Sequence, residues 1–198
     1  MQRHVKFIAA AMLAGAAALF AAPASSDDGW VVLLDKTKKG DWNEVGKANW
    51  EMKDGALVAD KLDGKDLSYL VSKQSYKDFQ IYAEFWVDDA ANSGIFIRCE
   101  KADVIDSKNC YEVNVFDKRP DPSYGTGAIV DVAKVDPMPK AGGKWNTYEI
   151  TAKGPQLTAV LNGQKVEGQD SKHLNAGPIA LQYGSGIVKF RLVKIKAL

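Results

Sequence analysis

The chain has 198 residues, with 26 Lys and Arg against 25 Asp and Glu, which gives a net charge of +1. Because coating a polyanion requires an excess of basic residues, this balance argues against a nucleic-acid-binding protein. Hydrophobic residues make up 46% and charged residues 26%, which is ordinary globular usage and excludes a wholly disordered, collagen-like or multi-span membrane protein.

The first 24 residues have the pattern of a signal peptide. Arg3 and Lys6 precede an apolar run over residues 7–22, and Ala22-Pro23-Ala24 has the small-x-small form of a cleavage site. The alternative is a transmembrane anchor, but a run of about 16 residues is shorter than the ~20 that span a bilayer. We therefore predict export to the periplasm or the cell exterior, one mature domain over residues 25–198, and no membrane contact after cleavage.

The mature chain shows period-2 alternation in many short segments and almost no helical periodicity. Turn signals such as Asp54-Gly55 and Asn162-Gly163 separate these segments, and the second suits a type I′ hairpin turn. Strands are predicted at residues 30–34, 57–59, 80–87, 94–99, 111–116, 145–152, 157–161, 164–166, 179–183 and 187–195. Many short strands in one domain predict an all-β fold, and at this length a two-sheet antiparallel jelly-roll sandwich.

The two cysteines, Cys99 and Cys110, are close in the sequence. In an oxidising compartment such a pair closes a short loop. A zinc site would need further ligands, but the one histidine of the mature chain, His173, is far along the sequence. We predict a structural disulfide rather than a zinc site or a reactive thiol. His173 follows a polar stretch and is predicted to be a surface residue.

The segment 117–144 is rich in Pro and Gly and does not fit a strand. A long excursion of this kind in a compact β domain is either disordered or lines a site. The segment directly follows the polar strand predicted over residues 111–116, which favours the second interpretation.

Three consecutive predicted strands each have one aliphatic face and one face that mixes aromatic with polar side chains. Aromatic rings stack on sugar rings, and carboxylate, amide and guanidinium groups bind hydroxyls. We predict that the mixed faces form one carbohydrate-binding surface on a single sheet. The alternative is a sheet face covered by the long loop, in which Arg98 pairs with Glu84 or Glu112. The residues of the mixed faces are Tyr82, Glu84, Trp86, Phe96, Arg98, Glu112, Asn114 and Phe116.

A conventional retaining glycosidase needs two carboxylates about 5–5.5 Å apart. The alternating positions on the third strand are Glu112, Asn114 and Phe116, so a partner carboxylate is missing there. Glu84 on another strand is the remaining substitute. The sequence therefore gives little support to simple double displacement.

The sequence resembles the 3-keto-disaccharide hydrolase family. The resemblance rests on Trp50-Glu51, on residues 92–98 and 111–117, on Thr126-Gly127-Ala128 and on residues 177–182, in that order. It implies a concanavalin A-like fold, a carbohydrate substrate and cleavage of glycosides oxidised at C3. Many members carry a His soon after the Leu-Gln pair near the C-terminus, whereas this chain continues with Tyr183.

The chemistry that the resemblance implies needs one base rather than two carboxylates. A ketone at C3 acidifies the C2 proton, so a base can remove it, the enolate can expel the group at C1, and water can add back. Such a site requires a base, a group that stabilises the oxyanion, and donors that orient the sugar. We expect Glu112 or Glu84 as the base and Arg98 as the stabilising group. A divalent metal could share that role, although no spacing identifies its ligands.

No cofactor and no oligomeric state is indicated by the sequence. A non-catalytic carbohydrate-binding module and a conventional β-glucanase are the alternative functions. The predicted sugar contacts are Tyr82, Trp86, Asn92, Phe96, Asn114, Phe116, Asp117 and Gln182.

Overall fold

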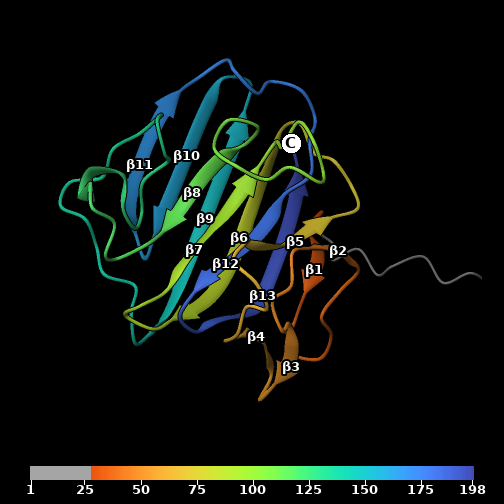
Figure 1. The fold of residues 1–198 in the computed structure, drawn as a ribbon. Coiled ribbons are helices and arrows are strands. Elements are labelled where there is room, and N and C mark those ends of the chain that lie inside the picture. The colour runs from red at the N-terminus through yellow and green to blue at the C-terminus, as the bar shows by residue number, and fades with distance from the viewer. Residues whose placement is uncertain (1–27) are drawn as a thin grey trace, which may run out of the picture.

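The computed structural model describes residues 28–198, which form two antiparallel β-sheets packed face to face (Figure 1). In spatial order, the eight-stranded sheet contains β11 (Gln164–Gln169), β10 (Gln156–Leu161), β9 (Trp145–Lys153), β6 (Phe79–Val87), β13 (Val188–Ala197), β4 (Ala56–Ala59) and β3 (Glu51–Lys53), with β1 (Val31–Leu34) also paired to β13. The five-stranded sheet contains β2 (Trp42–Val45), β5 (Ser68–Ser72), β12 (Ala180–Ser185), β7 (Asn92–Ile97) and β8 (Tyr111–Val115). The predicted two-sheet antiparallel sandwich is confirmed. A single 3-10 turn, η1 (Pro122–Tyr124), lies in the long loop.

The core lies between the two sheets and follows from the period-2 alternation. In β6, Ile81, Ala83 and Phe85 are buried, whereas the residues between them are half-buried on the outer face. Ile95 and Leu181 of the five-stranded sheet join the same hydrophobic cluster. Burying a large apolar side chain stabilises a fold by about 1.5–3 kcal/mol. The inner faces therefore hold the molecule together, and a ligand site has to use an outer face or a rim.

Two strands of the smaller sheet, β2 and β5, are not predicted from the sequence. β5 is buried along its whole length, so it lacks the polar alternation that reveals a half-buried strand. Leu70 faces the core, whereas Tyr69 and Val71 belong to a second cluster on the outer side of the sheet. β2 is a four-residue edge strand beside β5.

Cys99 and Cys110 form a disulfide, as predicted. The bond closes the segment between β7 and β8, and both residues are buried. In the chain-entropy account, closing such a short loop stabilises the folded state by about 3 kcal/mol. Ile105 from this loop packs with Tyr69 and Phe96, so the disulfide fixes a loop that borders the outer face of the smaller sheet.

The segment 117–144 runs along the free edge of β8. The backbone amide of Val130 donates to the carbonyl of Glu112 at 2.9 Å, and the amide of Gly127 donates to the carbonyl of Asn114 at 3.1 Å. The loop thereby satisfies backbone groups that an edge strand would otherwise expose. It forms a wall beside the outer face of β8.

Within residues 28–198, no helix is long and apolar enough to cross a membrane. The predicted signal peptide, residues 1–24, lies outside the described residues. Its cleavage and the export of the protein therefore stay predictions.

Candidate functional site

The predicted single carbohydrate-binding face is wrong, because its residues are divided between the two sheets. Tyr82, Glu84 and Trp86 lie on β6 in the eight-stranded sheet, whereas Phe96 and Glu112 lie on β7 and β8 in the five-stranded sheet. Since the inner faces of both sheets form the core, the two sets occupy opposite outer faces of the sandwich. Strand parity correctly separates the two sides of each strand, but it does not reveal that the chain changes sheets between β6 and β7.

Glu84 is engaged in a surface network and does not lie near Glu112. Its carboxylate pairs with Nε of Arg191 and accepts a hydrogen bond from the Tyr82 hydroxyl at 3.3 Å. The Arg191 guanidinium also lies 4.2 Å from the ring centroid of Trp145. The expectation that Glu84 supplies a base or a second carboxylate to the Glu112 site is therefore wrong.

Arg98 is a structural residue and not a substrate contact. Its side chain is fully buried, with Nε donating to the carbonyl of Lys77 at 2.6 Å and Nη1 to the carbonyl of Gly154 at 2.7 Å. Nη2 pairs with Asp78 at 2.9 Å. These bonds tie the end of β7 to the other sheet, so no face of the guanidinium is left for an oxyanion. The predicted catalytic role of Arg98 is wrong.

His173 is buried, which contradicts its predicted surface position. Its Nδ1 lies 2.8 Å from the carboxylate of Glu100, and its backbone amide donates to the Tyr111 hydroxyl at 2.9 Å. The polar residues before His173 hide this anchoring in the sequence. The contacts lie at one end of the sandwich, beside those of Arg98.

Asp117 closes the long loop on itself. Its carboxylate accepts hydrogen bonds from the amides of Ala141 and Gly142 at 3.0 Å and from the Thr126 hydroxyl at 2.6 Å. These bonds use both oxygens and give Asp117 a structural role in the loop, and its predicted contact with a sugar stays a prediction.

The structure does bring four predicted residues together on the outer face of the five-stranded sheet. Along one row of neighbouring strands, Gln182 faces Tyr69 on one side and Gly94 on the other, and Gly94 faces Asn114. In the next row, Phe96 faces Glu112. Because directly opposite residues of antiparallel strands share a face, these side chains form one surface. We call this surface, made of Tyr69, Gly94, Phe96, Glu112, Asn114 and Gln182, the front face.

Asn92 and Phe116 extend the front face at one end. Asn92 precedes Gly94 by two residues on β7 and therefore points to the same side. A side chain at Gly184 would meet Nδ2 of Asn92 at 3.1 Å, which places the Asn92 amide over β12. Phe116 follows Asn114 by two residues at the end of β8 and is half-buried.

Gly94 leaves a space between the amide of Gln182 and the carboxyl group of Glu112. A Cβ atom at this position would lie 3.5 Å from Oε1 of Gln182 and 3.7 Å from Cγ of Glu112. Gly94 has no positive φ, so its backbone does not itself demand glycine. The missing side chain instead opens the floor of the front face where its polar groups converge.

Glu112 is the electrostatic centre of the front face. It is only 9% exposed, and its carboxyl group makes no hydrogen bond or ion pair with the residues that the structure describes. Burial raises the pKa of Glu112 to about 7, with the charge of Arg119 lowering it and that of Asp131 raising it further. A carboxyl group with a pKa near neutrality is suited to taking up and releasing a proton.

Two amide oxygens of the front face lack partners. Oε1 of Gln182 and Oδ1 of Asn114 are buried and accept no hydrogen bond within residues 28–198, although Nδ2 of Asn114 donates to the carbonyl of Tyr124 at 2.8 Å. A buried acceptor without a donor costs about 1–3 kcal/mol, and such groups are rare away from functional sites. Burial also raises the pKa of Tyr69 to about 12, so its hydroxyl stays neutral.

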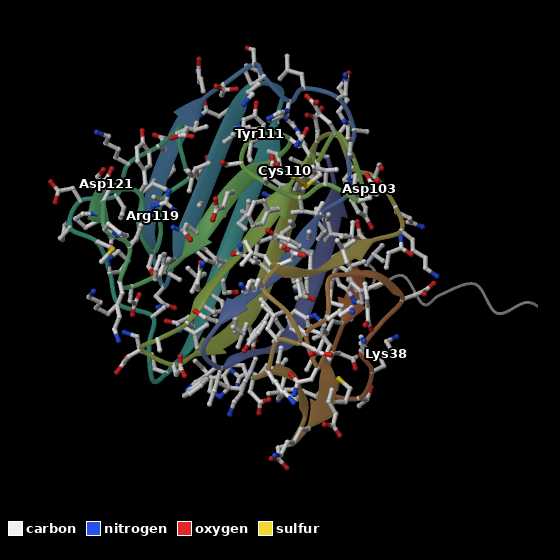
Figure 2. All side chains as sticks on the ribbon, in the orientation of Figure 1. Lys38, Asp103, Cys110, Tyr111, Arg119 and Asp121 are labelled. Carbon is white, nitrogen blue, oxygen red and sulfur yellow. A yellow bond between two sulfur atoms is a disulfide. The ribbon has the colours of Figure 1, made fainter. Side chains whose placement is uncertain are left out.

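Two loops border the front face on opposite sides (Figure 2). Arg119 and Asp121 lie in the long loop beside β8, whereas Asp103 lies in the disulfide-closed loop. A groove of about 400 Å³ continues from Tyr69 toward Asp103 and is lined by residues of both β5 and the disulfide-closed loop. The loops thus enclose a polar and aromatic surface of limited extent.

Sequence reasoning missed Tyr69, Arg119 and Asp131. Tyr69 belongs to the unpredicted strand β5, and its meeting with Gln182 depends on long-range register. Arg119 and Asp131 lie in the loop that was expected to line a site, but composition does not tell which of the loop's charged residues act on Glu112.

The described residues do not fit a metal centre. Among residues 28–198, no group of three or more His, Cys, Asp or Glu side chains gathers at distances that would hold an ion. The side-chain oxygen atoms of the front face come from one carboxylate, two amides and the neutral hydroxyl of Tyr69, which is a poor donor set for a divalent cation. We therefore derive no step through a metal.

Several solved structures have a similar fold. A candidate glycosyl hydrolase from Parabacteroides distasonis has a TM-score of 0.67 and 19% identity, over 86% of this chain and 89% of that one. A second from the same organism has a TM-score of 0.66 and 25% identity, over 85% of this chain and 99% of that one. The β-glucanase of Bacillus licheniformis has a TM-score of 0.61 and 14% identity, over 87% of this chain and 100% of that one.

The fold is that of the jelly-roll sandwiches that include these candidate glycosyl hydrolases and the β-glucanase. The chain belongs to the family described as the 3-keto-alpha-glucoside-1,2-lyase-like domain, which it matches over residues 29–196. The resemblance drawn from the sequence motifs is thereby confirmed. A search of curated proteins finds no match.

Proposed function

We propose that the protein is a glycoside-acting enzyme that cleaves 3-keto-α-glucosides, with Glu112 as its base. The observation that carries the proposal is the isolation of one buried carboxyl group. Glu112 has no ion-pair partner among residues 28–198 and a pKa raised to about 7, so a large share of it is ionised and basic at neutral pH. Family membership supports the substrate class.

The reaction is an elimination across C1 and C2 of the oxidised sugar. The ketone at C3 acidifies the C2 proton, which moves to the Glu112 carboxylate. The electron pair of the C2–H bond moves into the C2–C3 bond, and the ketone oxygen becomes an enolate oxygen. As the ketone re-forms, this pair becomes the C1–C2 double bond, and the bond from C1 to the leaving oxygen breaks with its electrons on that oxygen. The leaving oxygen takes up a proton from water or from Glu112, and water can then add across the double bond to complete a net hydrolysis.

Arg119 is the group that we assign to stabilise the enolate oxygen. Its guanidinium makes no hydrogen bond or ion pair with the residues that the structure describes, and its charge acts on Glu112. Arg98, by contrast, has its donors occupied inside the protein. A guanidinium keeps its charge at all working pH values, so it serves an oxyanion well.

The front face has no second carboxylate beside Glu112, and this argues against conventional double displacement. That mechanism needs two carboxylates about 5–5.5 Å apart. Glu84 lies on the opposite outer face and is paired with Arg191. The front face has a single carboxyl group and two amides, which suits removal of an acidified proton better than attack on an unactivated glycoside.

The test is a paired assay with a chromogenic 3-keto-α-glucoside and the corresponding unoxidised α-glucoside. We expect turnover of the first only. Glu112→Gln should lower kcat by about 10²–10⁴-fold with the fold unchanged by circular dichroism, whereas the matched control Glu84→Gln should leave kcat unchanged.

Three outcomes would reject the proposal. Turnover of both sugars would indicate a conventional glycosidase. Binding of both without turnover would indicate a carbohydrate-binding module. Near-normal turnover by Glu112→Gln would show that another group is the base.

We also propose that the protein works outside the cytoplasm. The N-terminal sequence has the form of a signal peptide, and a structural disulfide is typical of oxidising compartments. Cell fractionation and N-terminal sequencing of the purified protein should find it exported and beginning at residue 25. A cytoplasmic protein that keeps its N-terminus would reject this proposal.

A further inference from the structure

The outer face of the eight-stranded sheet carries two tryptophans side by side. Trp145 on β9 is directly opposite Trp86 on β6, Trp86 is opposite Lys189 on β13, and Lys189 is opposite Val58 on β4. All four side chains point away from the core, as the alternation in β6 and β9 requires. This row lies on the side of the sandwich away from the front face, and we call its surroundings the back face.

Cationic side chains hold these rings in place. Nζ of Lys189 lies 4.5 Å from the ring centroid of Trp86, and the guanidinium of Arg191 lies 4.2 Å from that of Trp145. Glu84 in turn fixes Arg191 through an ion pair. Trp145 is nevertheless 39% exposed. A large ring that is held rigid and left open to solvent is prepared for contact with a ligand, since little side-chain entropy remains to be lost.

A groove of about 420 Å³ lies beside Trp145. This volume is within the range of small-ligand sites. Its apolar lining comes from Trp145, Ile187, Val58 and Ala56, and its polar lining from Lys53, Lys189, Asp54 and Asp60. None of these four charged residues makes an ion pair with another described residue.

The balance of these charges identifies the kind of ligand. Two ammonium groups and two carboxylates offer donors and acceptors without a net charge. An anionic ligand would meet the two aspartates, and an apolar protein surface would bury all four charges without an ion pair to compensate their lost hydration. A neutral saccharide avoids both penalties. It carries no charge for the aspartates to repel, and its hydroxyls donate to the carboxylates and accept from the ammonium groups while the C–H face of the ring stacks on tryptophan.

We propose that the back face is a second carbohydrate-binding site, for a neutral polysaccharide, with Trp145 as its stacking platform. This site is separate from the front face and does not depend on Glu112. It would keep the protein on a polymer while the front face acts on small oxidised glycosides.

The test is affinity gel electrophoresis of the full-length mature protein. The gels contain soluble mixed-linkage β-glucan, arabinoxylan, galactomannan or amylopectin, with alginate as the anionic comparison. We expect at least one neutral polymer to retard the protein. Trp145→Ala should weaken that binding by about 10-fold or more, and Trp145→Phe should retain most of it. Since Trp145 is partly exposed, both variants should keep the wild-type thermal unfolding temperature within a few degrees.

Glu112→Gln is the matched control on the other face, and it should bind the polymer like the wild type. Trp145→Ala should in turn keep the wild-type turnover of the 3-keto-α-glucoside. The second site would be overturned if Trp145→Ala were retarded as strongly as the wild type, or if only alginate or none of the polymers retarded the protein. It would also be overturned if Glu112→Gln lost the binding. Loss of a dimer in Trp145→Ala, seen by light scattering, would show that a second copy occupies the back face instead.

Discussion

The two outer faces of the sandwich each carry a glutamate among aromatic residues, and the two glutamates differ in their partners. Glu84 on the back face pairs with Arg191, which in turn lies over Trp145. Glu112 on the front face is buried and has no ion-pair partner among residues 28–198. Burial without a compensating partner raises the pKa of Glu112 to about 7. The Glu84 carboxylate is instead held in an ion pair with Arg191.

Residue type alone does not define a catalytic group in this protein. Glu84 lies between Tyr82 and Trp86 on one face of its strand, whereas Glu112 is the one carboxylate of the largely apolar segment 111–116, which favours Glu112 as the base. The sequence does not show which of the two carboxylates has a partner. Partners distinguish them, and the same holds for the arginines. Arg98 is enclosed by carbonyl groups and Asp78, whereas Arg119 makes no ion pair with the described residues.

The largest effect on stability is expected from Arg98→Met. This substitution leaves the Asp78 carboxylate and the carbonyls of Lys77 and Gly154 without their buried donor. Each buried carbonyl that loses its donor costs about 1–3 kcal/mol, so the two carbonyls together cost about 2–6 kcal/mol. Asp78 adds less, because its side chain is 33% exposed and keeps the hydrogen bond from the Gly154 amide. Urea denaturation should show a loss of this order in the unfolding free energy.

Arg191→Met is the matched control for Arg98→Met. It also removes a guanidinium from an ion pair, but the pair lies at the surface, so the loss should stay within about 1 kcal/mol. Equal losses in the two variants would contradict the distinction between a structural and a surface arginine.

The fold could be predicted from the sequence where local periodicity was enough. The alternation in β6 assigns Ile81 and Phe85 to the core, and the short spacing of Cys99 and Cys110 predicts their disulfide. Local periodicity does not show to which of the two sheets a strand belongs. β6 pairs with β9 and β13, whereas β7 pairs with β8 and β12, and these choices depend on contacts between distant segments.

The candidate site shows the same limit. Phe96, Glu112, Asn114 and Gln182 were expected and do meet on the front face. The meeting of Gln182 with Gly94 and Tyr69 follows from register between strands far apart in the chain, which no motif reports. The buried state of Arg98 was hidden because its partners include backbone carbonyls, and a sequence does not show where those lie.

Ionisation of Glu112 should make the unfolding free energy fall and kcat rise as the pH increases. Its folded pKa of about 7 lies above its ordinary value of 4.5. The folded state therefore holds this proton more tightly, so the stabilising contribution is complete below pH 4.5 and is lost as the pH rises through about 7. The unfolding free energy of the wild type relative to Glu112→Gln should fall by on the order of 3 kcal/mol across this window.

Over the same window kcat should rise, because the ionised form is the base. Urea denaturation at several pH values and a pH–rate profile test both statements. A pH-independent difference between the two proteins, or a kcat that changes only near pH 4.5, would contradict the raised pKa of Glu112.

Gly94→Ala should weaken substrate binding with little effect on the backbone. The new methyl group would lie 3.5 Å from Oε1 of Gln182 and 3.7 Å from Cγ of Glu112, in the space that a sugar would use. It would also lie 3.1 Å from the carbonyl oxygen of Val113, so the strand has to shift slightly. Overpacking of this kind costs about 1–3 kcal/mol. We therefore expect the Kd for the 3-keto-α-glucoside to rise by about 10-fold. Calorimetric titration measures it, and unchanged affinity would place the sugar elsewhere.

The smallest effect is expected from Glu84→Gln on the back face. The substitution removes the ion pair with Arg191, but Gln can still accept the hydrogen bond from the Tyr82 hydroxyl. The pair is partly open to water, with side-chain exposures of 32% for Arg191 and 20% for Glu84, so screening limits its value to within about 1 kcal/mol. The unfolding free energy should fall by no more than that, and the loss should shrink in high salt. Turnover of the 3-keto-α-glucoside should stay at the wild-type level, because the sandwich core separates Glu84 from Glu112. If Glu84→Gln instead lowers kcat as strongly as Glu112→Gln, the two glutamates act together and the functional difference between the two faces does not exist.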